Sequence, residues 1–199
     1  MRAMDKRDTS AMNPEIPRLF DYAQHCRNRT RAAASFNEFD FLKTEGALRL
    51  ADRLELVRRD FPLCLDFGCH DGLLTNHLKQ TGKVEMVIQA DPTFEFAKSA
   101  RVNGPAIVSE AEQLPFAPAM FDAVFSCLSL HWIDDLPGLL TQMRALLKPD
   151  GMLLVSFLGG STLNELRTSF AEAESEIAGG ISPRAALMAD IRDVGGLLE

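Results

Sequence analysis

The chain has 199 residues, of which 46% are hydrophobic, and a formal net charge of −7 from 28 Asp and Glu against 21 Lys and Arg. This length and apolar content predict one globular domain with a substantial core. The acidic balance lacks the cationic surface that binding to a phosphate backbone requires, so we expect no nucleic-acid partner. No run approaches the about 18 apolar residues that could cross a bilayer, so we expect no membrane span and a cytoplasmic protein.

The first part of the chain is expected to be a flexible arm followed by helices. Residues 1–17 are polar and interrupted by proline, which predicts a poorly ordered N-terminal arm. Residues 18–60 form a predicted helical segment. Apolar side chains recur there at helical spacing, at Ala47, Leu50, Ala51, Leu54 and Val57. This stripe predicts a helix that packs on one face of a sheet.

Residues 61–158 alternate between strand and helix patterns. The expected strands are residues 63–67, 84–90, 106–108, 121–128 and 152–158, and the expected helices are 72–79, 94–101 and 136–147. Strands that alternate with helices pair in parallel through right-handed crossovers. The pattern therefore predicts an α/β, Rossmann-like doubly wound sheet of five parallel strands, which would bind ligands at the carboxyl ends of its strands.

The last segment, residues 159–199, is predicted to be helical. Thr162-Leu-Asn-Glu165 matches a capping box and predicts a helix that continues to about residue 177. Glycine pairs and Ser182-Pro183 interrupt the pattern, and one or two shorter helices are expected to follow. We expect this segment to be cut short, because Gly195-Gly-Leu-Leu-Glu199 is typical of the middle of an element.

The turn after the first core strand contains Gly68 and Gly72. A dinucleotide fingerprint would require glycine at positions 70 and 73, where the chain has His70 and Leu73, so the spacing argues against a nicotinamide cofactor. Asp91 follows Gly72 at the offset at which an acidic side chain meets ribose hydroxyls. A nucleoside without a pyrophosphate fits this pair, and S-adenosylmethionine is such a ligand.

Several further segments extend this pattern. They are Leu65–Gly72 with Asp91, Glu110–Phe116, Met120–Ser126 and Leu146–Gly151. Over roughly residues 60–160, the sequence resembles class I S-adenosylmethionine-dependent methyltransferases of the methyltransferase-11 type. The resemblance implies S-adenosylmethionine as cofactor. It also implies a cofactor-binding set of Asp66, Gly68, Cys69, His70, Gly72, Asp91, Pro92, Glu110, Ala111, Glu112 and Ser126.

Within that set, the resemblance assigns different parts of the cofactor to different residues. Asp66 and the turn from Gly68 to Gly72 would contact the methionine part, Asp91 the ribose, and Glu110 with Ala111 the adenine edge. Glu112 is either a direct contact or a structural loop residue.

A narrower resemblance covers most of the chain. Ser126–Gly138, Gly159–Arg167 and Asp193–Leu198 are similar to a subgroup that includes a mitochondrial complex I assembly factor acting as a protein-arginine hydroxylase. The malonyl-carrier-protein O-methyltransferases of biotin synthesis are more distantly similar. The resemblance implies methyl transfer to a small-molecule or protein acceptor, with a complex I subunit among the candidates. The alternatives are a complex I assembly factor of the hydroxylase type and a non-catalytic scaffold protein.

The chain departs from the family pattern at two places. His70 replaces the usual middle glycine, so this position must accept a β-carbon, and histidine tolerates unusual backbone regions better than most residues. Family members also continue through two further strands that form an antiparallel edge, and this chain ends before them. An open strand edge exposes unpaired backbone groups, so we expect a partner chain, as in a homodimer, or the terminal helices to cover it.

Candidate catalytic and substrate-side residues follow the fourth strand. Ser129 and His131 are candidates for catalysis, with His131 either a base or orienting group or a helix cap. Trp132 is either a wall of the site or a core residue, and Arg167 either faces an acidic substrate or is a surface charge. Methyl transfer requires mainly positioning of the reactants.

No metal site is predicted. The four cysteines, Cys26, Cys64, Cys69 and Cys127, form no C-x-x-C pair and are expected to be reduced thiols. An iron oxygenase needs two histidines and one carboxylate, and the histidine spacing indicates no such set. A hydroxylase assignment therefore rests on the resemblance alone.

Overall fold

The computed structural model describes residues 18–182, 184 and 188–198, so the predicted flexible arm, residues 1–17, lies outside the described residues. The five strands are β1 (Phe61–Phe67), β2 (Val84–Asp91), β3 (Ala106–Val108), β4 (Phe121–Cys127) and β5 (Leu147–Ser156). The described helices are α1 (Tyr22–Ala32), α2 (Phe41–Glu55), α3 (Leu73–Gln80), α4 (Phe94–Ala100), α5 (Leu136–Leu146), α6 (Asn164–Ala178) and α7 (Ile191–Gly196). Two short 3-10 helices, η1 (Ala33–Glu38) and η2 (Leu130–Trp132), complete the order.

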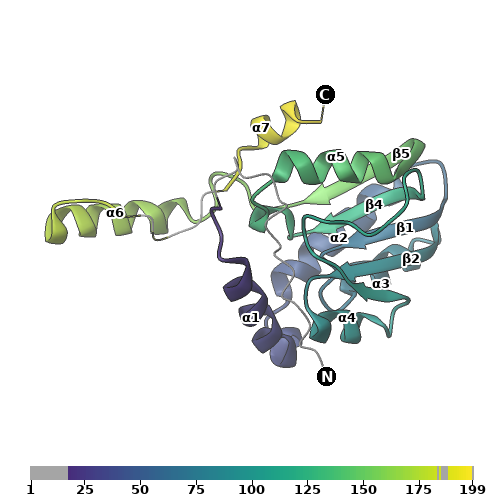
Figure 1. Cartoon of the computed structure of the whole chain (residues 1–199), viewed down its shortest axis with the longest axis horizontal. Helices are drawn as coiled ribbons and strands as arrows, with labels where there is room; N and C mark the ends of the chain where they lie inside the picture. Colours follow the sequence, from purple (N-terminus) through teal and green to yellow (C-terminus); the bar gives the residue numbers. More distant parts are fainter. Residues whose placement is uncertain (1–17, 183, 185–187, 199) are drawn as a thin grey trace, which may run out of the picture.

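The strands form one sheet in the order β3-β2-β1-β4-β5, and all of its pairings are parallel. The predicted Rossmann-like fold is confirmed. The chain moves outward from β1 in one direction through β2 and β3, and then crosses back to β4 and β5 (Figure 1). The strand order therefore reverses between β1 and β4. In such sheets ligands bind beyond the carboxyl ends of the strands at this point.

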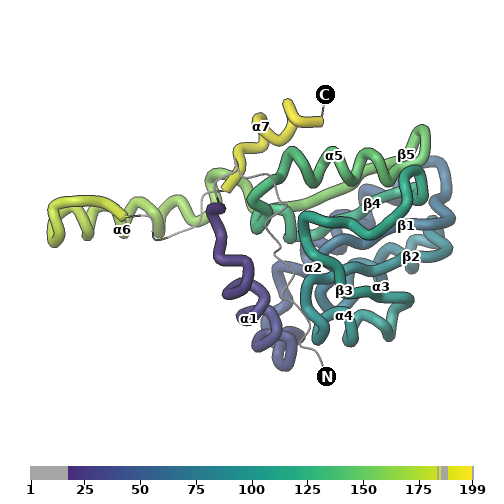
Figure 2. Tube along the Cα trace, viewed as in Figure 1, coloured from purple at the N-terminus to yellow at the C-terminus, as the bar shows by residue number. Residues whose placement is uncertain are grey.

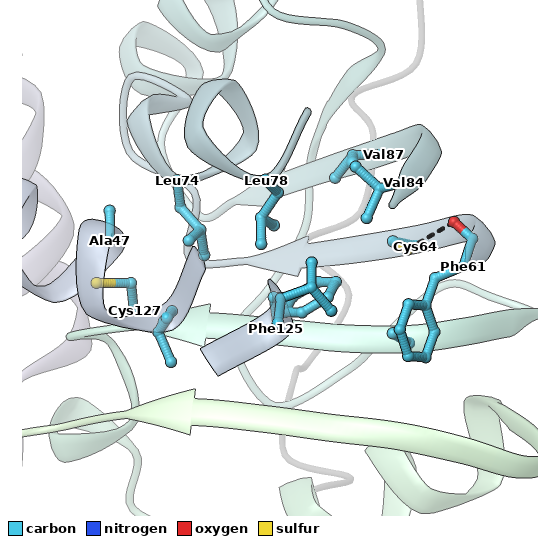
Figure 3. Packing of buried hydrophobic residues seen from close by; sticks show 12 residues of the cluster. Ala47, Phe61, Cys64, Leu74, Leu78, Val84, Val87, Phe125 and Cys127 are labelled. Atoms are coloured by element: carbon cyan, nitrogen blue, oxygen red, sulfur yellow. Dashed lines mark hydrogen bonds between the residues drawn. The ribbon is translucent and has the colours of Figure 1, made fainter. Parts of the chain in front are cut away.

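Helices α2 and α3 cover one face of the sheet. The predicted apolar stripe is buried there, because Ala47, Leu50 and Leu54 of α2 pack with Leu74 and Leu78 of α3 against the sheet. Figure 3 shows these α3 side chains above the strand residues Cys64 and Phe125. Burial of such side chains contributes about 1.5–3 kcal/mol each, which fixes α2 and the turn that precedes α3.

Helix α5 covers the opposite face. Its buried side chains Leu139, Leu140, Met143 and Leu146 pack on residues of β1 and β4, among them Val124. Asp135 caps the helix, since its carboxylate accepts a hydrogen bond from the N–H of Gly138 at 2.9 Å. The sheet is thus enclosed between two helical layers, and the site must lie at its ends.

Two local expectations were wrong. The fifth strand was expected at residues 152–158, but β5 begins at Leu147 because a bulge, in which Asp150 has φ 63°, is accommodated within the pairing with β4. The capping box expected at Thr162 does not form. Instead Leu163, with φ 56°, precedes α6, and no side chain caps that helix.

The C-terminal helices differ in their packing. Helix α6 has no buried residue, and it projects away from the sheet in Figures 1 and 2. Helix α7 is anchored by Val194, which is 4% exposed, and Leu197 and Leu198 after it line a cavity shared with Leu147 and Leu153 of β5. Within the described residues β5 pairs only with β4, so its outer edge carries no strand. Among the described helices none is long and apolar enough to cross a membrane.

Candidate functional site

The turn after β1 is shaped by three residues in the left-handed region. Gly68 has φ 67°, His70 has φ 54° and Gly72 has φ 84°. A β-carbon on Gly68 would lie 2.2 Å from the hydroxyl of Ser129, so only glycine fits. A β-carbon on Gly72 would lie 2.3 Å from the amide oxygen of Gln89. The turn therefore packs against the segment that follows β4 on one side and against β2 on the other.

His70 accepts its left-handed backbone because its side chain is held on every side. The ring stacks on Phe36 at 5.2 Å and meets Phe96 edge-on at 5.1 Å. Its Nδ1 lies 2.9 Å from the carbonyl oxygen of Gly68 and 2.8 Å from the ammonium of Lys43, and its Nε2 lies 2.8 Å from the guanidinium of Arg29. Burial, reinforced by these two cations, holds the pKa of His70 well below its ordinary value, so the ring is neutral at pH 7. In the tautomer whose Nδ1–H donates to Gly68, Nε2 accepts from Arg29, and the Lys43 ammonium donates to the carbonyl oxygens of Gly68 and Cys127 rather than to the ring.

Asp91 lies at the carboxyl end of β2 and is 1% exposed. One carboxylate oxygen accepts from the N–H of His70 at 2.9 Å and forms an ion pair with Arg29 of α1. The other accepts from the N–H of Thr93 at 3.0 Å and from its hydroxyl at 2.8 Å. The chain itself therefore fills every acceptor position of the Asp91 carboxylate, which was predicted to bind the ribose.

A second carboxylate and a second cation lie beside the turn. Asp66 of β1 is fully buried, and one of its oxygens accepts from the hydroxyl of Thr75 at 2.8 Å. Its other oxygen has no partner among the described residues. Burial raises the pKa of Asp66 to about 6 against the opposing effect of Lys43. The buried ammonium of Lys43 donates to the carbonyl oxygens of Gly68 at 3.1 Å and Cys127 at 2.7 Å, and it forms no ion pair within the described residues.

The residues after β4 come close to the same turn. The Ser129 hydroxyl is 3.0 Å from the carbonyl oxygen of Gly68. His131 has a buried Nδ1 without a hydrogen-bond partner among the described residues, and burial lowers its pKa to about 4. Trp132 is 38% exposed, so it is not a core residue. Its ring packs on His25 of α1 at 4.6 Å and meets Phe20 edge-on at 5.4 Å.

Two small cavities lie between α1 and the strand ends. The larger, of about 90 Å³, is lined by Arg18, Phe20, Tyr22, His25, Glu110, Ala111, Glu112, Trp132 and Asp134. The smaller, of about 20 Å³, is lined by Tyr22, His25, Arg29, Phe67, Gly68, Pro92, Ala111, Ser129, Trp132 and Ile133. Both are well below the roughly 300 Å³ of typical small-molecule pockets. The site is therefore closed in this arrangement.

The other predicted site residues, Glu112, Ser126 and Arg167, make hydrogen bonds within the chain. Glu112 accepts from the N–H groups of Asp134 and Asp135 at 2.8 and 3.1 Å, so it fastens the loop before α5. Ser126 donates to the carbonyl oxygen of Phe67 at 3.0 Å. Arg167 donates to the carbonyl oxygen of Gly160 at 2.5 Å and lines neither cavity, so it lies apart from the cluster.

The cysteines and the metal-ligand residues give no further site. Cys69, predicted in the cofactor turn, is a buried thiol whose pKa is raised well above its ordinary value by burial. Within the described part of the chain, no three His, Cys, Asp or Glu side chains are grouped so that they could hold a metal ion.

Arg29 and Lys43 were not predicted as site residues. Arg29 reaches Asp91 across 62 residues of sequence, and Lys43 reaches Cys127 across 84. On a helix, a cation of this kind is usually a solvated charge. The only available signal was the unusual position of Lys43 on the buried face of α2.

Comparison with known proteins identifies the class. Residues 65–155 match the family model described as a methyltransferase domain. A solved complex between the Haloferax volcanii Trm112 methyltransferase activator and a methyltransferase has a similar fold. Its TM-score is 0.66, at 16% identity, over 85% of this chain and 73% of that chain. Residues 65–155 therefore match a methyltransferase domain, and the sheet has the class I methyltransferase fold that the sequence predicted, which implies S-adenosylmethionine binding.

Two named relatives are more similar in sequence. The mitochondrial arginine-hydroxylase NDUFAF5 of Mus musculus is 38% identical over 194 residues, which are 96% of this chain and 57% of the relative. The malonyl-[acyl-carrier protein] O-methyltransferase of Xylella fastidiosa (strain M23) is 34% identical over 164 residues, 79% of this chain and 56% of the relative. The chain thus spans little more than half the length of these relatives.

The expected cytoplasmic localisation is wrong by this comparison. The similar arginine-hydroxylases of Mus musculus, Rattus norvegicus and Homo sapiens are all named mitochondrial. The expectation rested on composition and on the lack of an apolar run. Composition and apolar runs indicate whether a chain crosses a membrane. A targeting signal for an organelle is recognised by a receptor, and these two features do not reveal it.

Proposed function

We propose that the chain binds S-adenosylmethionine at the carboxyl ends of β1, β2 and β4 and transfers its methyl group to an acceptor. The observation that supports this most is a set of three buried charges around one turn. Among the residues that the structure describes, Asp66 has a carboxylate oxygen without a partner and Lys43 has no carboxylate partner, and Asp91 is a carboxylate at the end of β2. A zwitterionic amino acid joined to a ribose carries the complementary groups, so the donor set fits this cofactor.

Each residue then has a role in binding. Asp66 would accept from the ammonium of the methionine part, Lys43 would pair with its carboxylate, and Asp91 would accept from the ribose hydroxyls. Glu110 and Ala111, which line the larger cavity, would border the adenine. When bound, the cofactor supplies an electrophilic methyl group on a sulfonium.

His131 is proposed to orient the acceptor rather than to deprotonate it. A pKa of about 4 keeps the ring neutral at pH 7 and leaves it a weak base. Its free Nδ1 accepts a hydrogen bond from the acceptor, and the partly exposed Trp132 forms an apolar wall next to it, with ring centroids 5.5 Å apart. Methyl transfer is an in-line displacement, for which positioning and exclusion of water supply most of the acceleration.

A second candidate is favoured by similarity rather than by geometry. It is a complex I assembly factor of the protein-arginine hydroxylase type, with a protein arginine as its substrate, and the support for it is that the arginine-hydroxylase relative matches nearly the whole chain. The complex with an activator protein makes a protein partner a reasonable expectation as well. A homodimer across the β5 edge stays a prediction.

The test is a calorimetric titration with S-adenosylhomocysteine. Wild type is expected to bind in the micromolar range, about −8 kcal/mol. Asp91→Asn should weaken binding at least tenfold, whereas Glu85→Gln, on the exposed part of the same strand, should have no effect. Thermal unfolding of both variants checks that the fold persists. If neither wild type nor Arg29→Ala, which frees Asp91 from its ion pair, binds at millimolar ligand, the chain is a scaffold and the proposal fails.

A further inference from the structure

We propose that α1 is a lid on the cofactor site and that Arg29 locks it by occupying the carboxylate of Asp91. This inference rests on the proposed function, because it names what must move before the cofactor can enter. The lid is defined as residues 22–32, which form α1. Figures 1 and 2 show α1 standing across the carboxyl ends of the strands, outside the two layers that enclose the sheet.

The lock is a direct competition for one acceptor. Arg29 and Asp91 form an ion pair in which the carboxylate is fully buried and the arginine side chain is 10% exposed. With His70 and Thr93 as its other donors, Asp91 has no position left for a ribose hydroxyl. Arg29 must therefore leave before the ribose can bind.

The lid also accounts for the small volume of the site. Residues of α1 and of the segment before it line both cavities, with His25 and Tyr22 common to the two. Arg29 itself borders the smaller one and extends over the ring of Phe96 at 5.0 Å. Moving this one helix would join the two cavities along the strand ends.

The closed position is only weakly held. Helix α1 has no buried residue, so little apolar burial opposes its release. The Nε of Arg29 is buried without a partner among the described residues, which costs about 1–3 kcal/mol. A buried ion pair gains little net free energy once desolvation is counted. The pair thus gives the lid a definite closed position without making opening prohibitive.

The lid has further contacts at both of its ends. Near the end that carries Arg29, the hydroxyl of Thr30 donates to the carboxylate of Glu95 at 3.1 Å, and Phe36 of η1, which directly follows α1, stacks on His70. The carboxylate of Asp134 accepts from the N–H groups of Leu19 at 2.8 Å and Phe20 at 3.1 Å. Phe20 and His25 also pack on Trp132. Opening therefore breaks the exposed Thr30–Glu95 hydrogen bond as well as the Arg29–Asp91 ion pair, while the packing of Phe36 and the contacts at the start of α1 limit how far the helix moves.

The test compares Arg29→Ala with Arg27→Ala, which removes the same charge from an exposed position of the same helix. Two quantities are measured: the dissociation constant of S-adenosylhomocysteine, and the amide hydrogen exchange of residues 22–32 in the ligand-free chain. Arg29→Ala should bind about tenfold more tightly than wild type, within the usual range of coupling between sites. It should also exchange faster in α1 but not in α5, whereas Arg27→Ala should match wild type in both.

The possible outcomes distinguish a failure of the lid proposal from a failure of the proposed function. Weaker or unchanged binding by Arg29→Ala, beside normal binding by wild type, would overturn the lock and leave the proposed function standing. Unchanged exchange in α1 would likewise overturn it, because the ion pair would then not hold the helix. Binding by neither wild type nor Arg29→Ala would remove both proposals. Binding by Arg29→Ala alone would support both.

Discussion

His70 places an imidazole ring at the centre of the turn after β1. The ring is neutral and lies between two cations, Arg29 and Lys43, so it fills space without adding charge. Its left-handed backbone costs about 1–2 kcal/mol relative to glycine. The packing against Phe36 and Phe96 offsets that cost.

Replacing this ring tests how far it restricts the site. His70→Gly should bind S-adenosylhomocysteine about tenfold more tightly, because the ring volume beside Gly68 is freed for the ligand. Isothermal calorimetry measures the change. His77→Ala, at a half-buried histidine of α3, serves as the control and should leave the affinity as it is. Weaker binding by His70→Gly would mean that the ring itself contacts the ligand.

Asp66 predicts a defined pH dependence of stability. Burial raises its pKa from 3.8 to about 6, so below about pH 4 the carboxyl is protonated in both states and imposes no penalty. Between about pH 4 and pH 6 the folded state holds a proton that the unfolded state has lost. Stability therefore falls as the pH rises, by up to about 3 kcal/mol at 1.36 kcal/mol per unit.

The Asp66→Asn variant removes this titration and keeps an acceptor for the hydroxyl of Thr75. The free energy of unfolding in urea is measured for both proteins across that pH window. The variant should become more stable relative to wild type as the pH rises. A difference that stays constant with pH would show that Asp66 is ionised in the folded protein throughout.

At the level of single residues, the sequence predicts what depends on local spacing. Gly68, Gly72 and Asp91 follow strand ends at fixed offsets, and the structure brings them together around one turn. Arg29 and Lys43 reach the turn with long side chains from distant helices. Spacing marks only the position of Lys43 on the apolar face of α2, and neither spacing nor hydropathy encodes which partners these long side chains reach.

Helix α2 is tied to the sheet by a polar contact as well as by its apolar stripe. Lys43 joins it to the carbonyl oxygens at the ends of β1 and β4. Lys43→Met would remove a buried charged donor from both oxygens, so we expect a loss of about 2 kcal/mol in unfolding free energy. Removing the cation should also raise the pKa of His70, which NMR titration of the ring can follow.

The matched control for this tie is Lys79→Met. Lys79 donates to the carbonyl oxygen of Asn103 at 2.5 Å, but it is exposed, so water can replace the bond. Urea unfolding should show a change below about 0.5 kcal/mol. Equal losses in the two variants would show that the buried position of Lys43 adds nothing to the stability of α2.

The elements were predicted best where burial is periodic. The stripe of α2 and the apolar face of α5 are both buried, and their helices occur where expected. The start of α6 was wrong because Leu163 enters the left-handed region, which a capping-box pattern at Thr162 does not reveal. The early start of β5 depends on the bulge at Asp150, which pairing with β4 determines and local sequence does not.

On the scale of the whole molecule, β5 is one of the two edge strands of the sheet, and no strand pairs with its outer edge among the described residues. Of the two covers expected for it, a partner chain or the terminal helices, the structure places α7 beside β5. Val194 is 4% exposed there, whereas Ile191 of the same helix is 75% exposed. The two residues form a matched pair of apolar positions that differ mainly in burial.

We therefore expect Val194→Asp to detach α7 and Ile191→Asp to leave it in place. A buried charge without a partner costs several kcal/mol, so the first variant should unfold at lower urea. It should also uncover the apolar side chains of Leu147 and Leu153 and associate with itself as concentration rises, which sedimentation velocity detects. Wild type and Ile191→Asp should sediment as monomers at the same concentrations. A wild-type dimer would show instead that a second copy covers the β5 edge and that α7 alone does not protect it.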